Sequence, residues 1–524
     1  MIDPGSKPGI SSTRWSGTCA FKVPRSHQPL PSNFAARARR ITPWSFNTLE
    51  LLSLGAILVF YVFVWAFEGV VEPSTANIVG SSAFIVVLLL TCLAALKVGR
   101  LSIWEALFWF RTSCLVYYGV GSLVPHFGSG ETVLYMQNLY PFSDRELLKV
   151  NTINTTSTLI VLSGSQCIAS RKKLRPKSRV PASSRAAMVT ASGFVALGAV
   201  ARYSIMVPSL LGTDTALLSG AAVASAKLYP AGLLILLVIG LRRRPILLVP
   251  AIGLTIIDLI VGVLLFNKTD VVITILFTVL AIYHARPSFT RLVLGASISV
   301  VLLYQLTPLV TFGRERVAQL TELQAQVTLD QRWSIAGEYF RQQENAFHRN
   351  DEFQPLLNRI SYVNAMTMVV SWYDQGRPGQ TLDTALYFFV PRLIWPEKPI
   401  LTASGRELYS EATSQLGTSI SPGLFAESYW NFGWIGLFIL LFPLGIVLRA
   451  ISNLALQKIE QDNWLYLPCI LMGVGIGTRV DGHYVADVLA PTLILFAFYI
   501  CCRLVELFAC IVHRHCPHHD TKIR

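Results

Sequence analysis

Long apolar runs recur along this chain and are separated by shorter polar segments. Each run is long enough to cross the hydrocarbon core of a membrane, about 30 Å thick, as an α-helix. The runs lack the period of two that spanning strands require, because such strands alternate lipid-facing and inward-facing residues. The pattern predicts an all-α polytopic membrane protein with about 12 transmembrane helices. These helices are expected at residues 49–67, 78–96, 103–124, 151–169, 187–208, 219–241, 245–265, 270–284, 292–310, 430–449, 464–479 and 484–502.

The charged residues predict how these helices are oriented. Only 14% of the 524 residues are charged and 52% are hydrophobic, a balance typical of membrane proteins. With a cytoplasmic amino terminus, the predicted inner segments carry 27 Lys and Arg, and the short outer loops carry three, Arg145, Lys149 and Lys268. Positive flanks resist translocation, so both termini are predicted to be cytoplasmic. The net charge of +14 then reflects topology and contact with anionic lipid, and gives no reason to expect a nucleic-acid partner.

This topology divides the chain into five parts. In order, they are a disordered cytoplasmic tail at 1–48, nine helices at 49–310, one large extracytoplasmic loop at 311–429, three helices at 430–502 and a second cytoplasmic tail at 503–524. The first tail has no apolar h-region, so we do not expect a cleaved signal peptide. Within the large loop, the apolar stretches 362–372 and 385–395 are too short to span, and we expect them to lie along or re-enter the membrane surface.

Several familiar motifs are missing from the sequence. It contains no Gly-rich nucleotide-binding loop before a helix, no paired metal motif and no internal repeat. We therefore expect neither a cofactor nor a metal site. If the protein is an enzyme that transfers a chemical group, the sequence does not support a group donor activated as a cytosolic nucleotide. The donor is then expected to be attached to a lipid carrier.

The large outer loop is rich in arginine, which makes up nine of its ten basic residues. A guanidinium grips phosphate with a rigid fork, whereas Lys would serve solvation equally well. Arg314 and Arg316 stand where the ninth helix leaves the membrane and are candidates to bind a lipid diphosphate, or interfacial arginines paired with Glu315. Arg392 and Lys398 project from a proline-rich segment, which is a second candidate site or a rigid loop with solvated charges.

A third cluster lies at residues 418–436, where the tenth helix begins. Small hydroxyl residues and glycines surround Glu427, Tyr429 and Asn431 there. Glycine permits close approach of the backbone, and the exposed amides of a helix start favour an anion. Glycines that only allow helices to pack would give the same pattern.

A fourth cluster lies at the outer end of the eleventh helix, where Arg479, Asp481 and His483 fall within five residues. Together they are candidates to orient a phosphate and to supply a base to a sugar hydroxyl. The alternative is a salt bridge between Arg479 and Asp481 in a tight turn. Two charges inside predicted spans, Arg111 and Arg202, are expensive in hydrocarbon and are expected to line a hydrophilic groove.

Three of these segments follow one another in a distinctive order around the large outer loop. They read "PRLIWPEKP" at 391–399, "SISPGLFAESYWNFGWIG" at 419–436 and "TRVDG" at 478–482. In this combination the chain resembles the bacterial O-antigen polymerases, the Wzy-type oligosaccharide repeat-unit polymerases. The resemblance covers residues 300–495 in detail, whereas residues 49–300 match only in hydropathy and spacing.

The resemblance implies a GT-C-like fold and a glycosyltransferase that polymerises oligosaccharide repeat units carried on undecaprenyl pyrophosphate, at the outer face of the bacterial inner membrane. It implies these lipid-linked glycans and membrane lipid as partners, together with a chain-length regulator and a flippase. Two alternatives stay open. One is an O-antigen ligase, and the other is a polysaccharide transporter or flippase with Asp258, Lys227 and Arg202 along its path.

The resemblance also implies roles for individual residues. Those carried over by position are Arg392, Lys398, Tyr429, Asn431 and Arg479 for binding of pyrophosphate and sugar, and Glu427 and Asp481 for catalysis. Arg314 and Arg316 match only the family's habit of outer-face arginines. His483 is assigned as a base from its chemistry alone.

Overall fold

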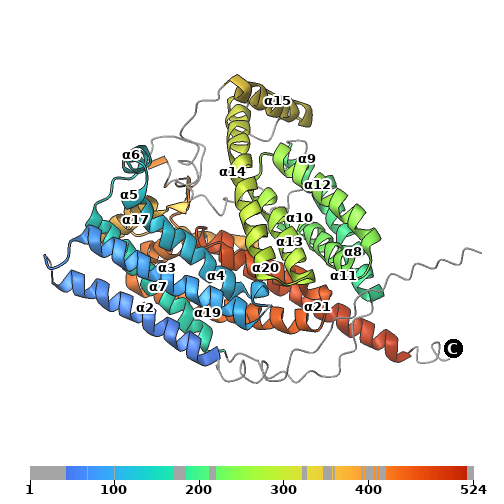
Figure 1. Ribbon diagram of the computed structural model, residues 1–524, viewed down its shortest axis with the longest axis horizontal. Coiled ribbons are helices and arrows are strands. Elements are labelled where there is room, and N and C mark those ends of the chain that lie inside the picture. The colour runs from blue at the N-terminus through green and yellow to red at the C-terminus, as the bar shows by residue number, and fades with distance from the viewer. Residues whose placement is uncertain are drawn as a thin grey trace, which may run out of the picture. The chain divides into compact units, whose positions relative to one another are not determined.

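The computed structural model describes residues 43–67, 69–99, 101–168, 184–211, 220–320, 327–345, 357, 360–390, 395, 405–406, 408, 410–411 and 420–515. Residues Phe46–Arg524 form one compact unit. Every regular element in the described ranges is a helix (Figure 1). The predicted all-α class is therefore confirmed for this part of the chain.

The helices keep the chain order shown in Figure 1. Those of the first half are α2 (Pro43–Ala66), α3 (Pro73–Val98), η1 (Ser102–Trp104), α4 (Ala106–Cys114), η2 (Leu115–Val120), α5 (Gly121–Phe127), α6 (Gly130–Leu139), α7 (Asp144–Gln166), α8 (Ser184–Ala199), η3 (Val200–Met206), α9 (Val207–Leu210), α10 (Gly220–Ala226) and α11 (Leu228–Arg242). Those of the second half are η4 (Pro245–Leu247), α12 (Leu248–Leu264), α13 (Lys268–Ala285), α14 (Phe289–Leu320), α15 (Leu329–Asn345), α17 (Val363–Asp374), η5 (Thr381–Phe389), α19 (Leu424–Glu460), η6 (Trp464–Tyr466), α20 (Leu467–Thr478), η7 (Tyr484–Leu489) and α21 (Ala490–His515).

Eight helices in the described ranges are long and apolar enough to cross a membrane. Two further apolar helices, Asp270–Ala285 and Trp464–Thr478, are shorter. Each of the twelve predicted ranges overlaps a helix of the structure. This is the architecture of a polytopic α-helical membrane protein, in which twelve as the number of spans stays a prediction.

The helices run further into the predicted outer loop than the apolar pattern indicates. α14 continues past the expected end at 310 to Leu320, and α19 begins at Leu424 instead of residue 430. Between them, α17 buries its apolar side chains, among them Met366 and Val369, and packs against α7 and α19. Protein therefore covers most of the stretch 362–372, which the pattern alone assigned to the membrane surface.

Close backbone contact holds the central helices together. α19 packs chiefly against α7, and a glycine on each helix makes the approach possible. A Cβ atom on Gly445 would lie 2.0 Å from the carbonyl oxygen of Val161, and one on Gly164 would lie 2.2 Å from that of Phe442. Small residues at such crossings are typical of membrane helix pairs, because lipid supplies no hydrophobic force and packing must do the work.

Two arginines inside the bundle are paired with carboxylates. Arg111 donates two hydrogen bonds to Glu50, of 2.7 and 2.8 Å, and the two side chains are 11% and 2% exposed. Arg202 lies 2.6 Å from Asp258 and 3.2 Å from Asp270. The expectation that Arg111 and Arg202 line a hydrophilic groove is therefore wrong: each guanidinium is buried against carboxylates, which offset its cost in hydrocarbon.

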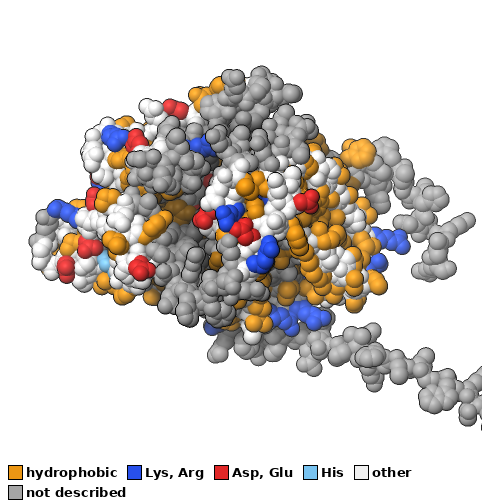
Figure 2. Space-filling model, turned by 90° about the horizontal axis from the view of Figure 1, so that it is seen from above, with side chains coloured by type: hydrophobic (Ala, Val, Ile, Leu, Met, Phe, Trp, Pro, Cys, Tyr) orange, Lys and Arg blue, Asp and Glu red, His pale blue; other side chains and the backbone are white. Residues whose placement is uncertain are grey.

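Contacts between helix ends join segments that the predicted topology assigns to the same side of the membrane. Lys458 pairs with Glu506 at 2.9 Å, and both belong to predicted inner ends. Lys149 pairs with Asp374, and both belong to predicted outer segments. Figure 2 looks onto the molecule from the top of Figure 1 and shows acidic and basic side chains intermixed on this face, with hydrophobic side chains along its sides.

Candidate functional site

The third and fourth sequence clusters meet where α19 begins. Gly423 precedes the helix with φ of 82°, a value that favours glycine. The backbone N–H of Leu424 then donates to the carbonyl oxygen of Val480 at 2.9 Å, and the Tyr118 hydroxyl donates to the same oxygen at 2.5 Å. These bonds fix the start of α19 against the turn between α20 and η7, which lies more than fifty residues later in the chain.

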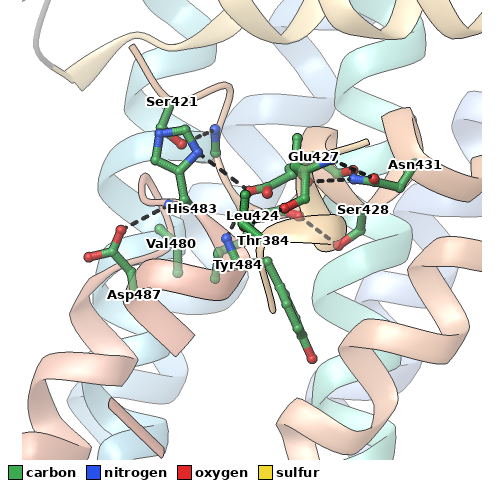
Figure 3. A network of polar contacts seen from close by, with 12 residues as sticks. Thr384, Ser421, Leu424, Glu427, Ser428, Asn431, Val480, His483, Tyr484 and Asp487 are labelled. Carbon is green, nitrogen blue, oxygen red and sulfur yellow. Dashed lines mark hydrogen bonds and ion pairs between the residues drawn. The ribbon is translucent and has the colours of Figure 1, made fainter. Parts of the chain in front are cut away.

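Glu427 and His483 face each other across this junction (Figure 3). The Glu427 carboxylate accepts a hydrogen bond from the Tyr484 N–H at 2.8 Å, and its Oε2 atom lies 3.9 Å from His483 Nδ1. Both side chains are buried, at 1% and 6% exposure. Since 3.9 Å is too long for a hydrogen bond, His483 Nδ1 has no hydrogen-bond partner among the described residues. A buried nitrogen without a partner is uncommon and marks a position where a ligand or a proton transfer can supply one.

The turn that carries His483 is held by Asp487. The Asp487 carboxylate accepts the backbone N–H of His483 at 2.9 Å. Gly482 leaves room for that carboxylate, because a Cβ atom there would lie 2.4 Å from its oxygen. Asp487 is not among the candidates predicted from the sequence, and its place four residues after His483 is the signal that would have found it.

Asp481 and Arg479 flank the pair. The Tyr362 hydroxyl lies 3.4 Å from Asp481 and donates a weak hydrogen bond to it. Burial raises the pKa of the Asp481 carboxyl above its usual range, and the charge of Arg479 opposes this shift. Arg479 ends α20 and is partly exposed. No contact shorter than 4 Å joins the two as an ion pair in the described structure, so the salt-bridge alternative for this turn is not what the geometry shows.

Asn431 lies one helical turn beyond Glu427 and is fully engaged by protein. Its amide nitrogen donates to the Glu427 carbonyl oxygen and to the Thr381 hydroxyl, both at 2.8 Å. Its amide oxygen accepts the Thr381 N–H at 3.2 Å. Both amide hydrogens are used, so the geometry gives Asn431 the task of holding η5 against α19, with no donor left for a sugar.

Directly after Asn431, α19 kinks. Phe432 and Gly433 leave helical geometry, and Gly433 takes φ of 60° and ψ of −146°. A Cβ atom there would lie 2.6 Å from the Tyr373 hydroxyl oxygen. The kink separates a short first helix, which carries Glu427, from the long apolar helix that follows, and glycine is needed for both the conformation and the space.

Tyr429 points away from the Glu427–His483 pair, because two residues along a helix rotate a side chain by about 200°. Its hydroxyl donates to Asp374 at 3.1 Å, and Asp374 also pairs with Lys149. The Tyr429 ring packs edge-on against Tyr373, at 5.1 Å between ring centroids, and Trp434, at 5.5 Å. Asp374 is not among the residues predicted from the sequence, although it ends the apolar stretch of α17, and Lys149 stands out in the sequence only as one of the few basic residues in the predicted outer loops.

Arg314 and Arg316 make their contacts elsewhere in the structure. Arg314 donates to the Phe266 carbonyl oxygen at 2.9 Å, and Arg316 pairs with Glu338. These contacts tie α14 to the turn after α12 and to α15, beside a separate small core that includes Phe266 and Val317. Both arginines therefore stabilise this corner. Arg392 and Lys398 lie outside the described residues.

The chain matches one family model, over residues 168–460, more than half of its 524 residues. It belongs to the family described as a domain of unknown function, DUF8712. The DUF8712 segment includes Glu427, Tyr429 and Asn431 and ends before Arg479 and His483. No curated protein and no solved structure matches the chain.

The site thus combines a proton acceptor with a cation. Glu427 and His483 are buried together, and Asp481 is a second carboxyl whose neutral form burial favours. Arg479 adds a partly exposed positive charge at the same turn. Two carboxyls beside a cation are suited to acid–base chemistry on a negatively charged substrate.

Proposed function

We propose that this DUF8712 protein is a membrane-embedded glycosyltransferase of the O-antigen polymerase type, which joins oligosaccharide repeat units carried on undecaprenyl pyrophosphate. The observation that supports it most is the buried Glu427–His483 pair, with Nδ1 and Oε2 3.9 Å apart and Nδ1 without a hydrogen-bond partner in the described structure. Residues 56 positions apart are brought together there by a kinked helix and a tight turn. A buried imidazole nitrogen without a protein partner is available to a ligand or to a proton.

In the proposed reaction, the oxygen of an acceptor sugar hydroxyl forms a bond to the anomeric carbon of the donor. The bond between that carbon and the diphosphate oxygen breaks, and the diphosphate leaves with the electron pair. The hydroxyl proton passes to Glu427, with His483 beside it to share the proton. Arg479 stabilises the charge that grows on the diphosphate, in a partly buried setting where such stabilisation is strong.

The aromatic group around Tyr429 fits the acceptor side of this scheme. The Tyr429 ring packs edge to face against Tyr373 and Trp434. Charged groups lie beside these rings, because Asp374 bonds to the Tyr429 hydroxyl and pairs with Lys149. Aromatic rings offer apolar faces on which sugar rings can pack, while charged groups bind hydroxyls. Trp434 is 46% exposed, so one ring of this group is open to a ligand.

The proposed location is the outer face of the bacterial inner membrane, with both chain termini in the cytoplasm. The outer face suits a donor that a flippase has already delivered, and a chain-length regulator is an expected partner. The polar residues of the site lie at helix ends, and the paired charges deeper in the bundle are neutralised. A transport path through the bilayer would need Arg202 and Asp258 free to exchange partners.

The glycan pattern of cells that lack this chain tests the proposal. Loss of a polymerase leaves single repeat units attached to their acceptor, and complementation with the wild-type gene restores long chains. Bare acceptor together with lipid-linked polymer would assign the chain as a ligase instead. Repeat units trapped on the cytoplasmic side would assign it as a flippase, and an unchanged glycan ladder would remove the chain from this pathway.

A further inference from the structure

Lys227 is a cation inside a predicted membrane span that the proposed reaction does not use. It stands at the turn between α10 and α11, at the amino-terminal end of the span Ala222–Arg242. Its side chain is exposed and makes no hydrogen bond or ion pair to any residue that the structure describes. A lysine at membrane depth is costly and is normally paired or placed at a water-filled cavity, so this position calls for an anionic partner.

Among the residues that the structure describes, the charges around Lys227 do not supply that partner. Asp270 and Asp487 attract it, and Arg479 repels it. Asp270 already bonds to Arg202 at 3.2 Å. Asp487 already accepts the backbone N–H of His483 at 2.9 Å. Both nearby carboxylates are thus committed to other groups, and neither comes within ion-pair distance of Lys227.

Arg479 is in the same situation on the opposite helix. α11 packs against α20, and Arg479 ends α20 as Lys227 precedes α11, so the two residues stand at the same end of two contacting helices. The Arg479 guanidinium is partly exposed and makes no hydrogen bond within the described part of the chain. Two neighbouring cations with unused donors favour an anion between them, because it attracts both and offsets their mutual repulsion.

We propose that Lys227 and Arg479 together form a binding site for a diphosphate, which would be the head group of the lipid-linked donor. Arg479 offers a planar fork that can bind one phosphate through two hydrogen bonds, and Lys227 offers a compact charge for the other. The site adjoins the turn that carries Asp481 and His483, so a bound diphosphate would bring its glycosidic bond toward the proposed base. Identifying the diphosphate with the donor rests on the proposed function, whereas anion binding itself does not.

Binding of inorganic pyrophosphate to the purified full-length chain tests the site directly. The protein is placed in nanodiscs of phosphatidylcholine and titrated by calorimetry, for the wild type and for the variants K227M, R479M and R316M. R316M is the matched control, because Arg316 is an outer-face arginine that is already paired with Glu338. Each of K227M and R479M should weaken binding about 10- to 100-fold, the range for losing one charge-assisted hydrogen bond, while R316M should leave binding unchanged.

Further variants and lipids make the outcome decisive. K227R keeps the charge and should retain most of the binding, whereas R479K keeps the charge but loses the fork and should bind more weakly than the wild type and more tightly than R479M. This graded series separates loss of the site from loss of the fold. Two results would overturn the proposal. One is that the wild type binds pyrophosphate no more tightly than R479M, and the other is that K227M binds as tightly as the wild type. Repeating the titration with phosphatidylglycerol in the nanodiscs distinguishes the two sources of phosphate. Pyrophosphate binding that this lipid abolishes would mean that lipid head groups occupy the two cations in a membrane, whereas binding that persists supports the diphosphate site. Because no glycan is present, this experiment can fail while the proposed polymerase activity stands, and the reverse also holds.

Discussion

The exchange of Glu427 for Gln is the sharpest test of the proposed acid–base pair. Gln has nearly the same shape, and its amide oxygen can still accept the Tyr484 N–H that now lies 2.8 Å from the carboxylate. The side chain is 1% exposed, so the variant replaces a buried carboxyl by a neutral amide of the same size and should fold as well as the wild type. What it loses is a proton acceptor 3.9 Å from His483 Nδ1.

The size of the effect follows from that loss. General acid–base catalysis contributes about 10²–10⁴-fold in rate, which corresponds to roughly 3–5 kcal/mol of the activation barrier. H483Q should cost a similar factor. Because the two residues act as one unit, the double variant E427Q/H483Q should be little worse than the poorer single variant, instead of showing the product of both effects.

The assay is the rate of chain extension in membranes supplied with isolated lipid-linked repeat units, with protein amount measured in each preparation. The matched control is E131Q, which makes the same chemical change at an exposed residue of α6. Wild-type rates in E427Q would refute the role of Glu427. Strictly multiplicative losses in the double variant would show that Glu427 and His483 do not work together.

Three further predictions concern the fold around the site. R111M should lower the free energy of unfolding by about 3–5 kcal/mol, because it leaves Glu50 as a buried unpaired charge. The double variant R111M/E50L should recover most of the lost stability. Denaturant unfolding in detergent measures the stability of both variants. G433A should destabilise the chain by about 1–3 kcal/mol through strain at φ of 60° and contact with Tyr373, and a wild-type melting temperature would contradict the kink. Burial raises the pKa of the Asp481 carboxyl, so its ionised form lowers the stability of the fold once the pH rises above the usual pKa of an aspartate. D481N should therefore raise the melting temperature at pH 8 and have a smaller effect at pH 5. Equal shifts of the melting temperature at the two pH values would contradict this expectation.

Much of the helical framework could be predicted from the sequence. A span needs about twenty apolar residues whatever its neighbours are, so hydropathy found ranges that overlap helices in all twelve cases. Helix ends were predicted less well. α14 extends to Leu320 and α19 starts at Leu424, because a helix need not end where the hydrocarbon does.

The partners of charged residues were decided by tertiary structure. Arg111 and Arg202 were expected in a groove, and the fold pairs them with Glu50, Asp258 and Asp270, which lie 61, 56 and 68 residues away in the chain. An ion pair between distant helices leaves no local trace in the sequence. A lone charge in an apolar run shows only that some partner is needed.

The candidate site shows the same division. The sequence by itself determined which chemical groups are present near the ends of the apolar runs, since polar residues stand out there, namely Glu427, Arg479, Asp481 and His483. Only the tertiary structure decided that Glu427 meets His483, that Tyr429 belongs to another cluster, and that Arg314 is bound to the Phe266 carbonyl oxygen. The reason is physical: spacing along a helix fixes the direction of a side chain relative to its neighbours in sequence, whereas contact between helices depends on the kink at Gly433 and the turn before His483, which bring distant segments to one point.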